Sequence, residues 1–274
     1  MARRAPRELR SEGLVEPRTT SMSSFQYVWL IWSGTFLAAF LVIYILSARY
    51  RSTMLVVGLA TMPLGLTERL FVPEYWNPPS LFDLAQRSGF DIESLIFAFS
   101  IGGIAAVLYS LIARRSSLPV VTTGRHRLHR LALATPALVF LILAFIGWNP
   151  IYPALIAMAA GAGAAVLCRP DLATRTVVGG LLFLVLYALF MLGLVFAVPG
   201  FIEQVWNLPA LSSLLIAGVP LEELLFGFAF GLYWANVYEH LSGTKPMAVP
   251  MRHHHQPGTA AERFSASRDG ESRD

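Results

Sequence analysis

Residues 220–240 read PLEELLFGFAFGLYWANVYEH, an apolar segment long enough to cross a bilayer that opens on two adjacent carboxylates, Glu222 and Glu223. A charged side chain at membrane depth costs roughly a few kcal/mol or more, so an acidic residue there indicates a functional role. Pro220 suits the first position of a helix, which places the two carboxylates in the first turn. The helix face through Glu222 continues at helical spacing with Phe226, Ala229, Tyr233, Asn236 and His240.

The composition is that of a membrane protein. Of the 274 residues, 55% are hydrophobic and 14% are charged, whereas about a quarter of a soluble domain is charged. The apolar residues form long runs, which predicts an all-α polytopic membrane protein. The net charge of +4 is not a nucleic-acid signal, because the arginines sit in loops between the apolar runs. Cys168 is the single cysteine, and no Cys/His spacing is typical of a metal site, so we expect no metal and no cofactor.

Seven apolar runs predict seven transmembrane helices. They cover residues 25–48, 53–72, 91–113, 128–147, 151–168, 176–198 and 220–240. Residues 1–24 are Arg-rich and residues 241–274 are polar, so we expect both to be disordered tails. The second tail contains His253, His254 and His255, which we expect to be solvated. Met22 directly precedes the first run and is a candidate start of translation beside Met1.

The placement of basic residues predicts the orientation in the membrane. One set of alternate loops holds Arg49, Arg51, Arg114, Arg115, Arg125, Arg127, Arg130, Arg169, Arg175, Lys245 and Arg252. The opposite loops offer Arg87 alone. Cytoplasmic loops are rich in Lys and Arg, so we expect the C-terminus in the cytoplasm and the N-terminus outside the plasma membrane of a prokaryote. The basic residues of segment 1–24 contradict this orientation unless translation starts at Met22.

An internal repeat divides the chain. Residues 76–81 read WNPPSL and residues 206–211 read WNLPAL. After a one-residue gap the match resumes with the pairs Glu93 and Glu222, Leu95 and Leu224, Phe97 and Phe226, Phe99 and Phe228, Gly102 and Gly231, Ala106 and Ala235, and Tyr109 and Tyr238. This many matches in register predict a duplication.

The repeat predicts the domain organisation. Residues 25–113 and 148–240 form two three-helix repeats, joined by a basic loop and linking helix at residues 114–147. The glutamate-bearing helices are four spans apart, so the two repeats run parallel, and sites in such proteins often lie between the repeats. Interfacial segments at residues 81–88 and 211–218 would place the tryptophans of the two motifs at headgroup level.

The paired carboxylates allow two interpretations. Glu222 and Glu223 are helix-start carboxylates that the macrodipole favours and water partly solvates, or at least one is buried among aromatic side chains. Burial and the adjacent like charge would keep one carboxyl protonated, and a general acid contributes roughly 10²–10⁴-fold to a rate. Aromatic rings at helical spacing are typical of a core or a lipid-facing surface, but they also stabilise a carbocation. The candidate substrate-binding residues are Phe97, Phe226, Tyr233, Trp234 and Asn236.

These features resemble the carotenoid cyclase family, the lycopene cyclases of bacteria, archaea and fungi that consist of two small membrane subunits or their fusion. The resemblance covers roughly residues 25–240 and is carried by PLEE at residues 220–223, by PEYWNPP at 73–79 and by FDIES at 90–94. It implies the fused form, a lipid-soluble polyene substrate such as lycopene within membrane lipids, and no flavin. It also implies a β-cyclase activity that closes the linear ψ ends of lycopene into β-ionone rings, in which Glu222 and Glu223 are essential.

The chemistry suits acids in an apolar site. An acid protonates the terminal double bond, the neighbouring double bond attacks the tertiary cation, and a base removes a proton from the new ring. The reaction is redox-neutral, so a carboxyl and a carboxylate suffice. We expect Glu222 to be the acid, because its helix face carries the polar stripe, and Glu93 or Glu223 to be its partner.

Two other function classes remain open at this stage. Intramembrane prenyl endopeptidases carry Glu-Glu-x-x-x-Arg followed by histidines on later helices, but Gly227 occupies the arginine position here. Sensitivity to metal chelators would favour that class. A small-solute transporter with three-plus-one-plus-three helices would show the same parallel repeats, although the spans are poor in polar residues that could line a pore. Solute uptake without any cyclised product would favour the transporter.

Overall fold

The computed structural model describes residues 25–113, 115–119 and 126–248, and this part of the chain is mostly helical. The α-helices are α1 Val28–Leu46, α2 Arg51–Thr61, α3 Leu84–Ser88, α4 Ile92–Ile112, α5 His126–Ala144, α6 Ile151–Cys168, α7 Ala173–Ala197, α8 Phe201–Val205 and α9 Leu221–Ser242. Short 3-10 helices are η2 Ala48–Tyr50, η3 Met62–Leu70, η4 Leu81–Asp83, η5 Pro170–Leu172 and η6 Leu208–Ala210. The strands β1 Arg115–Pro119 and β4 Thr244–Ala248 pair antiparallel, as do β2 Leu215–Ile216 and β3 Val219–Pro220.

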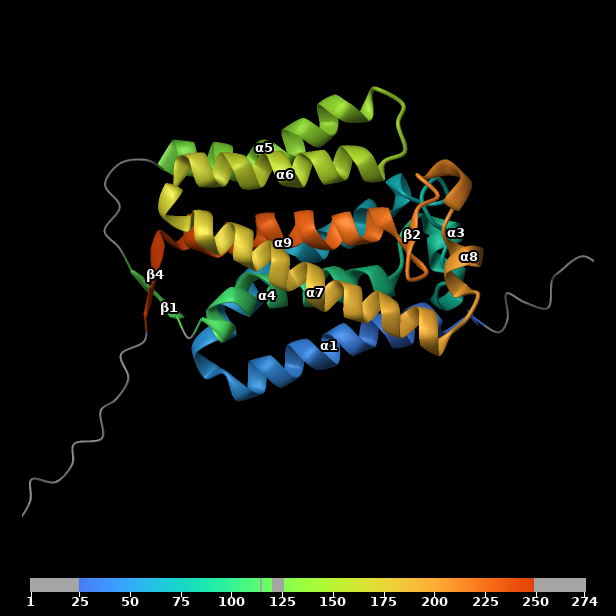
Figure 1. The fold of residues 1–274 in the computed structure, drawn as a ribbon, viewed down its shortest axis with the longest axis horizontal. Helices are drawn as coiled ribbons and strands as arrows, with labels where there is room; N and C mark the ends of the chain where they lie inside the picture. Colours follow the sequence, from blue (N-terminus) through green and yellow to red (C-terminus); the bar gives the residue numbers. More distant parts are fainter. Residues whose placement is uncertain (1–24, 114, 120–125, 249–274) are drawn as a thin grey trace, which may run out of the picture.

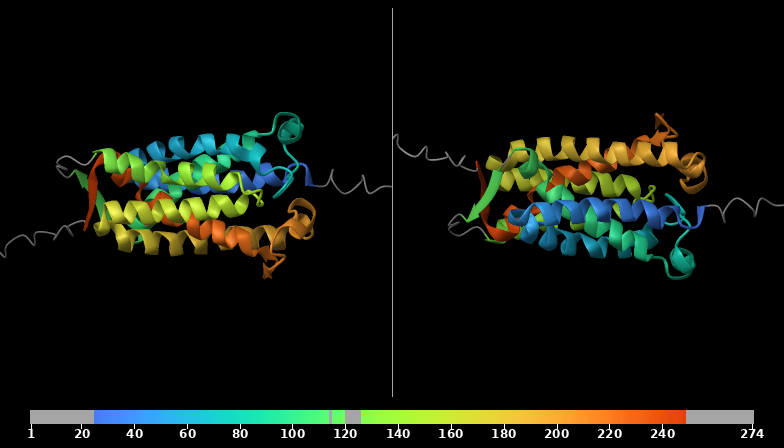
Figure 2. Two further views of the ribbon diagram at one scale, coloured as in Figure 1. Left: turned by 90° about the horizontal axis from the view of Figure 1, so that it is seen from above. Right: turned by 90° about the horizontal axis from the view of Figure 1, so that it is seen from below.

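The long helices lie side by side in one bundle (Figure 1, Figure 2). One end of the bundle carries α3, α8 and the β2–β3 hairpin and is called the α8 end; the other carries β1 and β4 and is called the β4 end. Helices α1, α4 and α9 all run from the α8 end to the β4 end, whereas α7 runs back (Figure 1). The helices that bear Glu93 and Glu222 are therefore parallel, and both glutamates lie at the α8 end.

Four of the described helical segments are long and apolar enough to cross a membrane. They are Val28–Leu46, Ile92–Ile112, Ile151–Cys168 and Pro170–Ala197. A helix of 19 residues such as α1 is about 28 Å long, close to the thickness of the hydrocarbon core. Large apolar side chains are exposed on their outer faces, as at Leu46 and Phe196. These helices fit a membrane protein, whereas the seven-span layout stays a prediction, because α5 contains a shorter apolar segment and α9 carries acidic residues.

Close helix packing occurs at two glycines that the repeat aligns, Gly102 in α4 and Gly231 in α9. A Cβ atom at Gly102 would collide with the side chain of Thr61, at the end of α2. A Cβ atom at Gly231 would lie 2.5 Å from Cβ of Phe183, in α7. Small residues let helix backbones approach closely where apolar surroundings provide little drive for association. Each glutamate-bearing helix is thus held against the helix that precedes it in the same repeat.

The second predicted span differs from the continuous α-helix that we expected. The α-helix ends at Thr61 and continues as the 3-10 helix η3, which begins at Met62 and has Pro63 in its first turn. Proline has no N–H to donate to an α-helical ladder. Gly65 then lies against the backbone of α4, where a Cβ atom would be 2.7 Å from the carbonyl carbon of Ser94. The chain forms the narrower 3-10 helix here because it passes so close to α4.

Other segments also differ from expectation. The two segments predicted to be interfacial fold differently: residues 81–88 form the short helices η4 and α3, whereas residues 211–218 contain β2. Their interfacial placement stays a prediction. The tail predicted from residue 241 begins with the end of α9 and with β4, which extends to Ala248. The predictions for residues 1–24 and for His253, His254 and His255 lie outside the described residues.

Candidate active site

Glu223 lies in the first turn of α9 and accepts three hydrogen bonds. Oε1 accepts the phenol of Tyr75 at 2.5 Å and the indole N–H of Trp206 at 2.8 Å, and Oε2 accepts the phenol of Tyr187 at 2.5 Å. The donors come from the loop after η3, from the end of α8 and from α7. Glu223 is only 5% exposed. These three neutral donors replace the water that a buried carboxylate loses.

Tyr75 remains a donor because its own surroundings are apolar. Burial, followed by the charge of Glu223, raises the pKa of the Tyr75 phenol well above its ordinary value of 10.0. The phenol therefore keeps its proton at neutral pH and points it at Glu223. This contact links the two predicted repeats, because Tyr75 belongs to the first and Glu223 to the second.

Glu222 is bound asymmetrically. Its Oε1 accepts the phenol of Tyr152, in α6, at 2.8 Å and the backbone N–H of Ser212 at 2.8 Å. Its Oε2 is buried and has no hydrogen-bond partner among the described residues, and the side chain as a whole is 2% exposed. A buried polar atom without a partner costs free energy, and a carboxylate loses much of that cost when it binds a proton. Glu222 therefore has one anchored oxygen and one oxygen that no donor among the described residues reaches.

Glu93 repeats part of this arrangement in the first half of the chain. Its Oε1 accepts the backbone N–H of Leu81 at 2.7 Å, and its buried Oε2 has no hydrogen-bond partner among the described residues. Asp91 is the N-cap of α4, because its side chain accepts the backbone N–H of Ser94 at 2.5 Å. Glu68 hydrogen-bonds Ser94 and faces both acids, so the first half holds a carboxylate cluster of its own.

The two Trp-Asn motifs contact each other directly. The backbone N–H of Asn77 donates to the carbonyl of Val205 at 2.8 Å, and the N–H of Asn207 donates to the carbonyl of Tyr75 at 2.9 Å. The rings of Trp76 and Trp206 lie 5.3 Å apart. Trp206 is 5% exposed and donates its indole N–H to Glu223, so it packs inside the protein. The headgroup depth expected for the two tryptophans stays a prediction. The two motifs thus hold the two halves of the chain together beside the carboxylates.

Aromatic rings continue from the carboxylates into the bundle. Phe97 and Phe226, which the repeat aligns, lie with their ring centroids 6.4 and 5.5 Å from that of Tyr187. Phe36 and Phe190 complete the cluster, with their rings 4.3 Å apart. Phe97 and Phe226, two of the predicted substrate-binding residues, therefore both pack against Tyr187, which donates to Glu223.

The other three predicted substrate-binding residues lie farther along α9. Tyr233 donates to the carbonyl of Leu133, in α5, at 2.8 Å, and the ring of Trp234 meets the ring of Tyr233 edge to face, with ring centroids 5.1 Å apart. Asn236 donates to Oγ1 of Thr176, in α7, at 2.5 Å. Because a helix rises about 1.5 Å per residue, Asn236 is about 21 Å along the axis from Glu222. The two hydrogen bonds join α9 to α5 and α7 rather than to the carboxylates.

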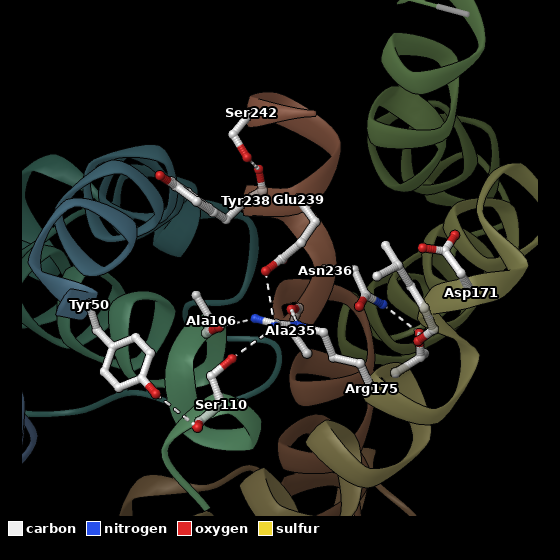
Figure 3. Close-up of polar contacts among 12 residues, drawn as sticks. Tyr50, Ala106, Ser110, Asp171, Arg175, Ala235, Asn236, Tyr238, Glu239 and Ser242 are labelled. Carbon is white, nitrogen blue, oxygen red and sulfur yellow. Dashed lines mark hydrogen bonds and ion pairs between the residues drawn. The ribbon is translucent and has the colours of Figure 1, made fainter. Parts of the chain in front are cut away.

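A second charged network lies near the β4 end (Figure 3). Nη1 of Arg175 lies 3.0 Å from Oε1 of Glu239, and the two side chains are 2% and 0% exposed. The guanidinium also donates to the carbonyls of Ala235 and Ala106, both at 2.6 Å, and to Oγ of Ser110 at 2.9 Å. The sequence placed Arg175 among the loop arginines, but the structure buries it inside α7 as a link between α4, α7 and α9.

The donors that surround the glutamates were not predicted from the sequence. Tyr75, Tyr152, Tyr187 and Ser212 were not candidates, although Tyr75 and Trp206 lie in or beside the repeated motif. A polar side chain inside an apolar span was the available signal for Tyr187. The hollow at the α8 end is lined by Val195, Val198, Pro199, Gly200, Ile202 and Glu203, and it does not reach Glu222 or Glu223.

The comparison with known proteins finds a match in the second half of the chain. Residues 149–241 match the model of a family described as lycopene cyclase. Neither a curated protein nor a solved structure matches the chain. The matched segment runs from the loop before α6 to the last turns of α9, so it contains Tyr152, Tyr187, Trp206 and both adjacent glutamates. Residues 149–241 of this chain are therefore similar to the lycopene cyclase family.

Proposed function

We propose that this protein is an integral-membrane carotenoid cyclase that converts the linear ψ ends of lycopene, or of a related polyene, into β-ionone-type rings. The observation that carries the proposal is the contrast between two adjacent carboxyl groups: the buried Oε2 of Glu222 has no hydrogen-bond partner in the described part of the chain, whereas Glu223 accepts three hydrogen bonds. The family match over the segment that holds both glutamates supports it.

Glu222 acts as the acid in this mechanism. The proton on Oε2 passes to the terminal double bond of the ψ end and leaves a tertiary carbocation. The neighbouring double bond attacks this cation and forms the carbon–carbon bond that closes the ring. Loss of a ring proton then forms the ring double bond, so one proton enters and one leaves without a redox change. Oε1, anchored by Tyr152 and Ser212, holds the carboxyl in place throughout.

Glu223 is ionised when the cation forms, and its negative charge stabilises the developing positive charge. Its three donors stabilise the carboxylate, and an anion in a water-poor site stabilises a cation more strongly than it would in water. Phe97 and Phe226 add their ring faces, each worth about 0.5–2 kcal/mol for a desolvated cation. Glu223 is the first candidate for the base that takes the ring proton, and Glu93 is the second.

The site differs from that of the rival protease class. Glu222 and Glu223 contact tyrosine, tryptophan and backbone N–H groups rather than histidine. His129 and His240, which contact each other, lie toward the β4 end instead. These contacts favour acid–base chemistry on the carboxyl groups over metal-dependent hydrolysis.

The layout in the membrane is part of the same proposal. We place seven spans, two parallel three-helix repeats in one fused chain, and a cytoplasmic C-terminus in a prokaryotic plasma membrane. The parallel course of α4 and α9 and the reciprocal contacts of the Trp-Asn motifs support the repeats. A reporter fused after residue 248 should read as cytoplasmic, and a non-cytoplasmic reading would overturn this orientation.

Pigment analysis in a host that accumulates lycopene tests the activity. The wild-type chain should convert lycopene to cyclised carotenoids, and Glu222→Gln should abolish conversion at an unchanged protein level. Glu203→Gln is the matched control, because Glu203 is an exposed acid at the same end of the bundle. Unchanged lycopene with well-expressed wild-type protein, together with solute uptake in proteoliposomes, would favour a transporter instead.

A further inference from the structure

Three metal-binding side chains converge near the β4 end although they are far apart in the sequence. His129 lies near the start of α5, Cys168 is the last residue of α6, and His240 lies in the last turns of α9. One ligand atom from each lies within 4.8 Å of the other two. The Nδ1 atoms of the two histidines are 2.9 Å apart, although 111 positions separate the residues.

The burial of the cluster sets it apart from a chance surface group. His240 is 6% exposed, and its Nε2 atom is buried without a hydrogen-bond partner among the described residues. Cys168 and His129 are half-buried. Arg169 and Asp171 also face His240, but they form an ion pair with each other at 2.8 Å. The nearby positive charge is therefore offset, and the cluster offers two imidazoles and a thiol in a partly dehydrated place.

We propose that His129, Cys168 and His240 bind one divalent zinc ion. Zinc prefers nitrogen and sulfur donors in a tetrahedral arrangement, with Zn–N near 2.0–2.1 Å and Zn–S near 2.3 Å. Ligand atoms around such an ion lie about 3.3–3.6 Å apart. The two Nδ1 atoms are 2.9 Å apart and the three ligand atoms lie within 4.8 Å of one another, so small movements of the side chains bring them to this spacing. A histidine pair that only shared a hydrogen bond would not account for the thiol beside it. Three protein ligands leave the fourth position to water.

The site would act as a clamp between helices rather than as part of the cyclisation chemistry. It joins α5, which precedes the family-matched segment, to α6 and α9 within that segment. All three ligands lie at the end opposite the carboxylates, and 18 residues of α9 separate Glu222 from His240, a rise of about 27 Å. An ion that binds the folded chain and not the unfolded one stabilises the fold by mass action. The proposal therefore does not depend on the cyclase activity.

Cobalt substitution tests the site in the full-length protein. Cys168 is the only cysteine in the chain, so a thiolate-to-cobalt charge-transfer band can come from this residue alone. We expect the purified, metal-free protein in detergent to bind Co²⁺ one to one with such a band, and Zn²⁺ to displace it. Cys168→Ser should abolish the band, and His129→Ala and His240→Ala should each weaken Co²⁺ binding at least tenfold.

The control addresses the histidines of the C-terminal tail. Replacing His253, His254 and His255 together with alanine should leave the charge-transfer band and its cobalt affinity unchanged. Zn²⁺ should also raise the unfolding temperature of the wild type and of this control, but not that of Cys168→Ser. The proposal is overturned if no charge-transfer band forms in the folded wild type. It is equally overturned if the band survives both His129→Ala and His240→Ala, which would show cobalt on a lone thiolate.

Discussion

The phenol of Tyr75 donates a 2.5 Å hydrogen bond to Oε1 of Glu223, a residue 148 positions later in the chain. The contact places a side chain from the loop after η3 on the first turn of α9, so the carboxylate of one half depends on a donor from the other. The same oxygen also accepts the indole N–H of Trp206. Trp206 belongs to the motif that pairs with Trp76 and Asn77. The pairing of the two motifs therefore positions the donors of the candidate active site.

Tyr75→Phe removes one of the three donors and leaves the ring in place. We expect the free energy of unfolding to fall by about 1–3 kcal/mol, because a buried carboxylate oxygen loses a partner, and cyclisation to slow markedly. Thermal unfolding in detergent and pigment conversion provide the two measurements. Tyr27→Phe is the matched control, because Tyr27 is 54% exposed. Equal effects of the two substitutions would contradict the role assigned to Tyr75.

The same tyrosine predicts a change in stability at alkaline pH. The pKa of Tyr75 is raised above 10.0 in the folded protein, so the folded state holds this proton more tightly than the unfolded chain does. That contribution is fully present below pH 10 and is lost as the pH rises past this value. The wild type should therefore lose more stability than Tyr75→Phe between neutral and strongly alkaline pH. Parallel curves for the two proteins would show that the phenol is not buried against Glu223.

The asymmetry of the two glutamates predicts which one carries the proton. Infrared difference spectra of the purified protein should contain the C=O stretching band of a protonated carboxyl group. This band should disappear in Glu222→Gln and persist in Glu223→Gln. Tyr152→Phe should shift the band, because the phenol donates to the anchored oxygen of Glu222. A band that disappears in Glu223→Gln instead would reverse the assignment of acid and base.

The ion pair between Arg175 and Glu239 predicts a large stability effect far from the carboxylates. Breaking a fully buried pair by Glu239→Gln should cost about 3–5 kcal/mol, because the guanidinium stays buried without its counter-charge. Arg175→Gln with Glu239→Gln should cost less than the sum of the two single changes. The same cycle on Asp83 and Arg87, which lie 3.7 Å apart with side chains 66% and 73% exposed, serves as the control and should show a coupling of about 0–1 kcal/mol. Equal coupling in the two cycles would contradict the burial of Arg175.

Features that depend on a short stretch of sequence, such as helices and helix ends, could be predicted. The mostly helical fold with long apolar helices and the first-turn position of Glu222 and Glu223 follow from apolar run length and helix-end chemistry, and the structure agrees with both. The family resemblance is confirmed over residues 149–241. The break between α2 and η3 was missed, although Pro63 and Gly65 were visible, because the close approach to α4 that favours it is a tertiary contact.

Contacts between distant segments could not be predicted in the same way. Tyr75 reaches Glu223, Arg175 reaches Glu239, and His129 reaches His240 only after the helices pack together. A single sequence shows spacing along one helix but not which face meets which neighbour. Tyr233 and Asn236 share a helix face with Glu222 by spacing, yet they bond to α5 and α7 about 16 Å or more along the axis.

The origin of the proton added to the polyene tests the central claim most directly. Purified protein is equilibrated in D₂O, supplied with lycopene in lipid vesicles, and the cyclised product is analysed by mass spectrometry. If the exchangeable proton of Glu222 is delivered to the terminal double bond, each new ring gains one deuterium that does not wash out, and Glu222→Gln forms no ring. Rings that form without deuterium, or conversion that persists in Glu222→Gln, would contradict the account.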